Sequence, residues 1–207
     1  MDIRKDKRGF SLVELIITMA IMAIFAGAII GAVGWINAGK TRKASAKLNN
    51  QISSIQTATM TQKGETYLYI YRTSKGIYSS SVSSNEDFNH DGTPDYPYGF
   101  KERSELNTYL SNGGGQTKLC DSSVVIKGKK NADGTGSTES VTLTENNMFK
   151  IGYSKGTGAF TYSNDGQMDA SGELKGVPFY TLIEMKGKEK FTIQLVKATG
   201  KHFIKED

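Results

Sequence analysis

Residues 10–36 read FSLVELIITMAIMAIFAGAIIGAVGWI, and this stretch decides how the chain is built. From Leu15 to Ile36 the run is apolar apart from Thr18 and small residues. About 20 residues at helical rise cross the hydrocarbon layer of a bilayer, so the segment is long enough to span one. The sequence therefore predicts a membrane-spanning helix near the N-terminus.

The helical pattern continues beyond the apolar run. Leu48, Ile52, Ile55 and Thr59 recur at spacings of four, three and four residues, which is one face of an amphipathic helix. No proline interrupts the sequence between the two parts. We therefore expect one helix of about 50 residues, apolar all round in its first half and on one stripe in its second.

After Gly64 the chain changes to short segments rich in Tyr, Val, Thr and Ile, separated by Gly, Asn, Asp and Ser. This pattern predicts strands at 65–72, 123–127, 141–143, 148–153, 159–162, 178–185 and 190–197, a hairpin turn at 186–189 and a short helix at 101–110. A long helix followed by strands predicts an α+β fold, in which the apolar face of an antiparallel sheet packs on the second half of the helix.

Composition limits the classes of function. The 207 residues carry a net charge of +5, with the basic residues distributed along the sequence, so no specific nucleic-acid partner is predicted. Cys120 is the single cysteine, which excludes an intrachain disulfide and a multi-cysteine zinc site, and a lone thiol is usually a buried apolar group.

Glu14 places a carboxylate near the start of the apolar run, where it costs a few kcal/mol unless it has a partner. One explanation is that Glu14 lies at the helix N-terminus, where the macrodipole favours a negative charge. The surrounding residues 7–16, KRGFSLVELI, offer a second explanation. This segment resembles the processing site of type IV prepilins, in which a basic leader ends in glycine before a Phe and a Glu. The resemblance covers residues 4 to about 60.

The resemblance implies that a prepilin peptidase cleaves after Gly9 and methylates Phe10. Glu14 would then be the assembly carboxylate, paired with the N-terminal amine inside a filament. The implied divisions are a leader (1–9), a membrane and polymerisation segment (10–36), an amphipathic helix half (37–62) and an extracellular β-rich body (63–207). The chain would be a structural filament subunit and not an enzyme. Its partners would be copies of itself, other pilins, the peptidase and an assembly platform, first in the cytoplasmic membrane and then in an extracellular filament.

The sequence departs from the family pattern at two points. Many relatives have a helix-kinking proline deeper in the apolar stretch, where this chain has Gly27, Gly31 and Gly34. Many Gram-negative pilins also close a C-terminal loop with a disulfide, which one cysteine forbids, so a Gram-positive source is favoured.

Other topologies remain open at the level of sequence. Residues 26–28, Ala-Gly-Ala, fit a conventional signal-peptidase site, and an uncleaved signal anchor would also export the body. The alternative function is then a monomeric, membrane-anchored extracellular binding domain, with or without a dependence on calcium.

Residues 87–95, DFNHDGTPD, place oxygen ligands at alternate positions, as in an EF-hand calcium loop. The predicted ligands are Asp87, Asn89, Asp91, Thr93 and Asp95. Tyr98 stands where an EF-hand has its bidentate Glu, so Glu86, Glu102 or Glu105 would have to complete the shell. The competing interpretation is a polar turn built from Asx residues.

A serine-nucleophile pattern occurs at residues 152–156, GYSKG, but that motif needs a helix after it and the following residues favour a strand. The chain has two histidines, His90 in the Asp-rich loop and His202 in an expected exposed tail. We therefore predict no catalytic site.

Overall fold

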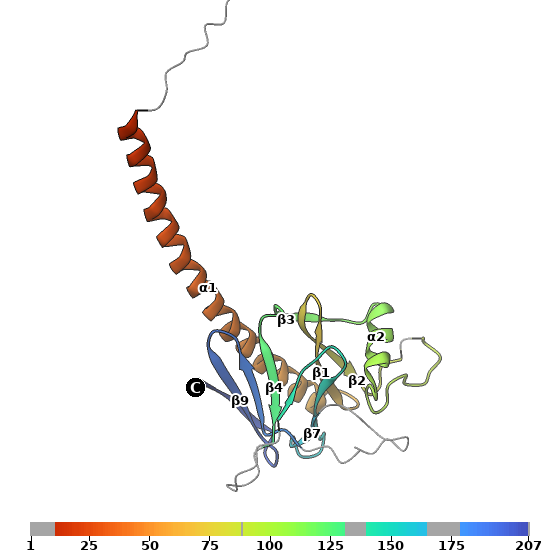
Figure 1. Ribbon diagram of the computed structural model, residues 1–207. Coiled ribbons are helices and arrows are strands. Elements are labelled where there is room, and N and C mark those ends of the chain that lie inside the picture. The colour runs from red at the N-terminus through yellow and green to blue at the C-terminus, as the bar shows by residue number, and fades with distance from the viewer. Residues whose placement is uncertain (1–10, 88, 131–139, 165–178, 207) are drawn as a thin grey trace, which may run out of the picture. The chain divides into compact units, whose positions relative to one another are not determined.

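The computed structural model describes residues 11–87, 89–130, 140–164 and 179–206, without the side chains of residues 28–38, 162, 164 and 206. The chain divides into two compact units, Met1–Gly39 and Lys40–Asp207. Helix α1 spans Leu12–Thr61, a length of 50 residues, so its first part belongs to the first unit and its second part to the second (Figure 1). The predicted long helix is confirmed.

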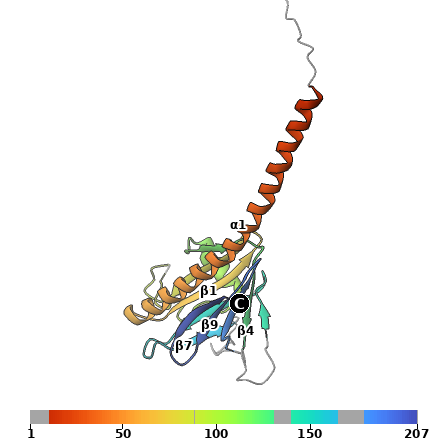
Figure 2. The same cartoon turned by 90° about the vertical axis from the view of Figure 1, so that its left-hand side faces the viewer.

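The second unit contains two antiparallel sheets (Figures 1 and 2). The first sheet has the order β3-β2-β1-β6-β7 and is built from β1 (Thr66–Thr73), β2 (Gly76–Ser83), β3 (Thr117–Cys120), β6 (Met148–Tyr153) and β7 (Phe160–Asn164). The second has the order β10-β9-β8-β4-β5 and is built from β4 (Val125–Lys129), β5 (Ser140–Thr142), β8 (Leu182–Lys186), β9 (Lys190–Val196) and β10 (Lys201–Glu206). A second helix, α2 (Arg103–Ser111), follows the Asp-rich loop.

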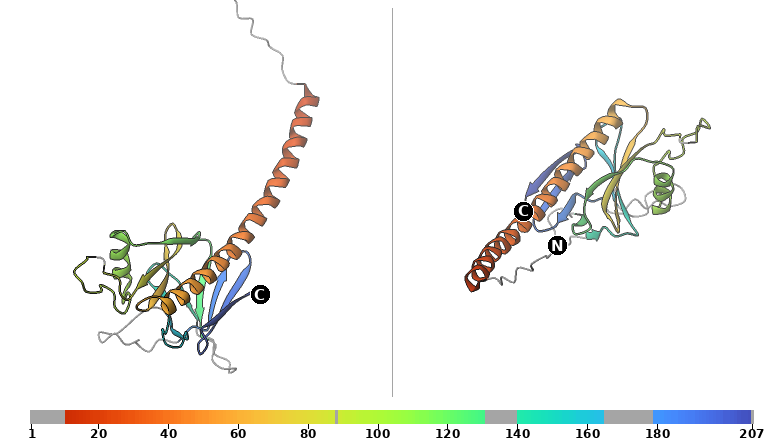
Figure 3. Two further views of the ribbon diagram at one scale, coloured as in Figure 1. Left: turned by 180° about the vertical axis from the view of Figure 1, so that it is seen from behind. Right: turned by 90° about the horizontal axis from the view of Figure 1, so that it is seen from above.

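The apolar stripe of α1 provides the centre of the main core. Leu48, Ile52 and Ile55 are buried at 0 to 3% exposure and share one cluster with apolar side chains of both sheets. Seen from behind, this half of the helix lies across the strands (Figure 3). Thr59, the last residue of the predicted stripe, is also buried, and its hydroxyl accepts a hydrogen bond from the backbone N–H of Thr66 at 3.0 Å.

Strand β1 is buried on both faces, which explains its unusual sequence TYLYIYRT. Leu68 and Ile70 point into the main core, whereas the three tyrosines at 67, 69 and 71 join a second cluster under α2. Alternate residues of a strand face opposite sides of a sheet, so helices on both sides demand large side chains at every position. The two helices therefore sandwich the first sheet.

The α+β class is confirmed, with two corrections to the predicted architecture. The body holds two sheets instead of one. Strands β2, β3 and β10 were not predicted, and β10 replaces the expected exposed tail. The predicted strand over 178–185 begins only at Leu182.

Candidate functional site

The first turn of α1 is closed by Ser11 and Glu14. The backbone N–H of Ser11 donates to Oε2 of Glu14 at 2.9 Å, and the backbone N–H of Glu14 donates to Oγ of Ser11 at 3.2 Å. This reciprocal pair is a capping box, which satisfies two N–H groups that the helix itself leaves unpaired. Glu14 thus stabilises the helix start in the isolated chain. Gly9 and Phe10 lie outside the described residues.

The first unit exposes apolar side chains on every side of the helix. Between residues 12 and 25 the large exposed ones are Leu12, Val13, Leu15, Ile16, Ile17, Met19, Ile21, Met22, Ile24 and Phe25. Their exposed fractions lie between 47 and 74%, an apolar surface far more continuous than the scattered residues of ordinary protein surfaces. Within the described part of the chain, no helix meets the length and apolarity needed to cross a membrane.

The Asp-rich loop folds around its own side chains. The carboxylate of Asp87 accepts hydrogen bonds from the backbone N–H groups of Asp91, at 3.2 Å, and Gly92, at 2.8 Å. The amide of Asn89 donates to Oδ1 of Asp95 at 3.2 Å, which joins the third and ninth loop positions. His90 has φ +58° and Gly92 φ +89°, so the backbone makes the sharp turns that draw these oxygens together.

The donor set of this loop fits a hard cation, because it consists of carboxylate, amide and hydroxyl oxygens. Hydrogen bonds donated by the hydroxyl and backbone N–H of Thr93 hold the pKa of the Asp91 carboxyl below its usual value. Across the residues that the structure describes, however, no group of three or more His, Cys, Asp or Glu side chains is arranged to hold a metal ion. Calcium binding by this loop stays a prediction.

Lys150 attaches the end of the same loop to the first sheet. Its side chain is fully buried in β6, and Nζ donates to the carbonyl oxygen of Tyr98 at 2.6 Å. Nζ also lies 4.3 Å from the ring centroid of Tyr67, a cation–π distance. Burial lowers the Lys150 pKa to about 7, against the opposing influence of Glu65 and Glu105. Sequence reasoning missed this residue, because a lysine inside a strand usually faces solvent.

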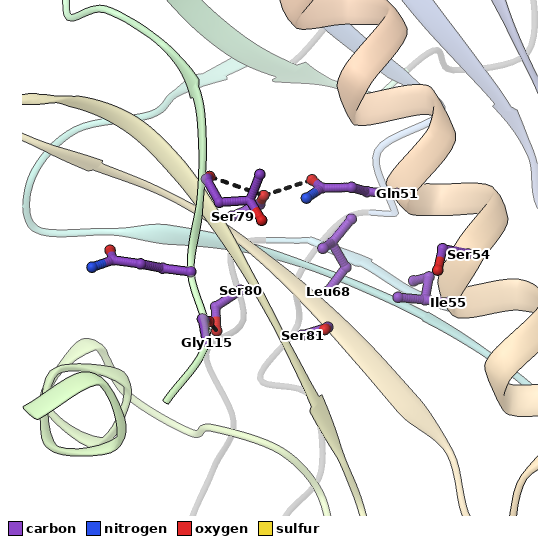
Figure 4. Close-up of a pocket in the computed structure, with 10 residues that line it drawn as sticks. Gln51, Ser54, Ile55, Leu68, Ser79, Ser80, Ser81 and Gly115 are labelled. Atoms are coloured by element: carbon purple, nitrogen blue, oxygen red, sulfur yellow. Dashed lines mark hydrogen bonds between the residues drawn. The ribbon is translucent and has the colours of Figure 1, made fainter. Parts of the chain in front are cut away.

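A small hollow lies between α1 and the first sheet (Figure 4). Its volume is 290 Å³, and its walls are uncharged residues that include Gln51, Ser79 and Ser80. Ser79 Oγ donates to Oε1 of Gln51 at 2.5 Å, and Ser80 Oγ donates to the carbonyl oxygen of Gly115 at 2.6 Å. These hydroxyls therefore stabilise the junction of helix, β2 and the segment before β3.

The surroundings of Ser154, Cys120 and His202 indicate structural roles for these three residues. Gly152 and Tyr153 end β6, and Ser154 begins the connection to β7, so a strand and not the helix of a nucleophile elbow follows the GYSKG segment. Cys120 is buried, as predicted, and burial raises the pKa of its thiol to about 11. The expectation for His202 was wrong: it is half-buried in β10 and shares hydrogen bonds with Ser53, at 2.8 Å, and Tyr153, at 3.2 Å.

A family model described as the prokaryotic N-terminal methylation motif matches residues 4–30. The chain carries the type IV prepilin-like signature. The match includes Gly9, Phe10 and Glu14 and runs into the exposed apolar part of α1. It supports a type IV pilin- or pseudopilin-like protein, and it implies processing by a prepilin peptidase and assembly with pilins. Searches of curated proteins and of solved structures found no match.

Proposed function

We propose that this protein is a structural subunit of a type IV pilus-like filament, matured by cleavage between Gly9 and Phe10. The observation that carries the proposal is the prepilin-like signature, followed directly by a helix with apolar side chains on all sides. Such a surface has two environments in which it is stable. It can lie in a bilayer before assembly, and it can pack against copies of itself in a filament core.

The capping box shows the partner of Glu14 in the single chain, from which its partner in an assembled filament can be inferred. In the single chain its carboxylate bonds to the N–H of Ser11, the residue next to the new N-terminus. In a filament core a carboxylate among apolar helices is tolerable only beside a cation, because a buried charge without a partner is costly. The methylated amine of a Phe10 is the cation that cleavage creates. Assembly would therefore bring Glu14 a charged partner in addition to its helix cap.

The second unit differs from the first part of α1, because its apolar helix face is buried. Its apolar stripe on α1 is already covered by the two sheets. Among the described residues from 40 onward, the exposed large apolar side chains are Met60, Tyr98, Val125, Phe203 and Ile204, against ten between residues 12 and 25. The first half of α1 would polymerise and the sheets and loops would lie on the outside.

The native N-terminus tests this proposal. We expect a mature protein of 198 residues, the 207 of the chain less the nine of the leader, that begins with N-methylated Phe10. Gly9→Val should block maturation, because a bulky side chain would not fit beside the scissile bond. Mass spectrometry of protein from the native host would refute the assignment if it found normal processing in this variant.

The competing function, a membrane-anchored monomeric binding domain, predicts different termini. It would retain its leader or begin after Ala28, and it would not appear in sheared filament fractions. The same mass spectrum, taken from filament and membrane fractions in parallel, separates the two functions.

A further inference from the structure

Basic residues that are far apart in the sequence meet at one end of the second unit. An open hollow of 410 Å³ there is lined by Lys40, Lys43 and Lys47 of α1 and by the segment 118–121. The three helix lysines are spaced so that they share one face, and Lys118 faces them. Lys40 and Lys118 keep 44% and 46% of their side chains exposed.

Two hairpin turns lie beside this hollow. Gly187, in the turn between β8 and β9, lies so close to the hydroxyl of Thr41 that a Cβ there would require the Thr41 side chain to move. A Cβ on Gly76, the first residue of β2 after the turn from β1, would lie 2.5 Å from the carbonyl oxygen of Cys120. Figure 1 shows both turns at the same end of the body as the β3–β4 connection. We call residues 40–47, 73–76, 118–121 and 186–189 together the basic collar.

The collar concentrates the positive charge of the body. Its four segments contain eight basic and two acidic residues, whereas the other residues between 40 and 207 contain 14 basic and 16 acidic ones. Asp121 is the acidic group within the hollow, paired with Lys118 Nζ at 2.8 Å and Lys40 Nζ at 3.4 Å. Three positive charges of the hollow are therefore not neutralised within its own lining.

The position of the collar along the chain indicates what it binds. Lys40 and Lys43 come four and seven residues after Ile36, the end of the apolar run. At helical rise this is about 6 and 10 Å of chain, and the polar headgroup layer begins where the hydrocarbon ends. Basic residues are normally fewer on the exported side of a membrane, so this cluster requires a reason.

We propose that the basic collar binds the anionic headgroups of phospholipids at the outer surface of the cytoplasmic membrane and seats the unassembled subunit there. The inference rests on the proposed function, because it requires residues 15–36 to lie in the bilayer. Each lysine near an anionic surface strengthens binding about fivefold, and the attraction weakens within a Debye length and at high salt. Leaving the membrane for a filament would release these contacts.

The chain provides its own probe for the test. Trp35 is the single tryptophan and lies five residues before Lys40. The full chain is reconstituted in vesicles of phosphatidylcholine with 30% phosphatidylglycerol, and either lipid is brominated so that it quenches a neighbouring tryptophan. We expect brominated phosphatidylglycerol to quench more than its mole fraction accounts for, corresponding to at least a fivefold preference. The preference should disappear at 1 M salt.

Three variants assign the effect to the collar. Lys→Gln at 40, 43, 47 and 118 together should abolish the preference. The matched control, Lys→Gln at the exposed positions 63, 155, 201 and 205, loses the same charge elsewhere and should keep it. Asp121→Asn frees two lysines and should strengthen the preference, a gain that misfolding cannot produce.

Each other outcome overturns the inference. Equal quenching by both lipids would refute the headgroup site and leave the filament function standing. No quenching by either lipid would refute both, because the helix would then lie outside the bilayer. Binding of duplex DNA that depends on the same four lysines, without a lipid preference, would assign the collar to nucleic acid instead.

Discussion

The capping bond of Glu14 and the role in assembly that we propose for its charge can be separated by substitution, because they respond to different changes. Glu14→Gln keeps an oxygen for the N–H of Ser11, since Glu and Gln both serve at this position of a capping box. It removes only the charge. Glu14→Val removes both. Ser11→Ala removes the hydroxyl that accepts the N–H of Glu14 and leaves the carboxylate in place.

The magnitudes differ enough to decide between the roles. Loss of one member of a buried charge pair costs ~3–5 kcal/mol, which is a reduction on the order of a hundred- to several thousandfold in the association of each subunit. Loss of the N-cap hydroxyl costs about 1 kcal/mol, or roughly fivefold. We therefore expect no filaments from Glu14→Gln or Glu14→Val and reduced but visible filaments from Ser11→Ala.

The assay needs a strain that expresses each variant without wild-type subunits. Filaments are sheared from the cells and measured by electron microscopy and immunoblot, and the mature N-terminus is verified in the membrane fraction. Both Glu14 variants should accumulate as processed, membrane-held subunits. Abundant normal filaments from Glu14→Gln would show that the charge is not needed. An equal defect in Ser11→Ala would show that the helix cap, and not the charge, limits assembly.

Two further predictions concern the body, measured on a fragment of residues 37–207. Calcium at 100 times its Kd should stabilise the fragment by about 2.7 kcal/mol if the Asp-rich loop binds it; an unchanged melting temperature in EDTA, or a calcium effect that survives Asp91→Ala, would reduce the loop to a turn. The pKa of Lys150 is about 7 in the folded chain and near 10.5 when exposed, so the unfolded state holds more protons between these values. Folding stability should therefore rise with pH from about 7 to 9.5, by up to ~1.4 kcal/mol per pH unit. Lys150→Met should remove this slope, and an identical pH profile in the two proteins would contradict the burial of the amine.

Elements whose apolar residues recur at a regular spacing could be predicted from the sequence. The apolar stripe of α1 could be recognised without a structure, because the apolar residues of one buried helix face recur every three to four positions in the sequence. Strand β2, GIYSSSVS, was missed because consecutive serines usually indicate a turn. Ser79 and Ser80 are tolerated inside this strand because Gln51 and the carbonyl of Gly115 accept their hydroxyl hydrogens. Those partners lie 28 and 35 residues away, beyond any local pattern.

The candidate sites differ in the same way: one is a continuous segment of sequence, and the others are assembled by the fold from distant residues. Gly9, Phe10 and Glu14 could be recognised because they lie in one short continuous segment, which matches the prokaryotic N-terminal methylation motif over residues 4–30. Burial lowers the pKa of Lys150, and the site that buries it includes Tyr67 and the loop carbonyl of Tyr98, which are 83 and 52 positions away in the chain. The basic collar is assembled from four segments whose charges, counted along the sequence, look evenly distributed. A net charge of +5 therefore conceals a strongly basic end and a slightly acidic remainder, and only the fold separates them.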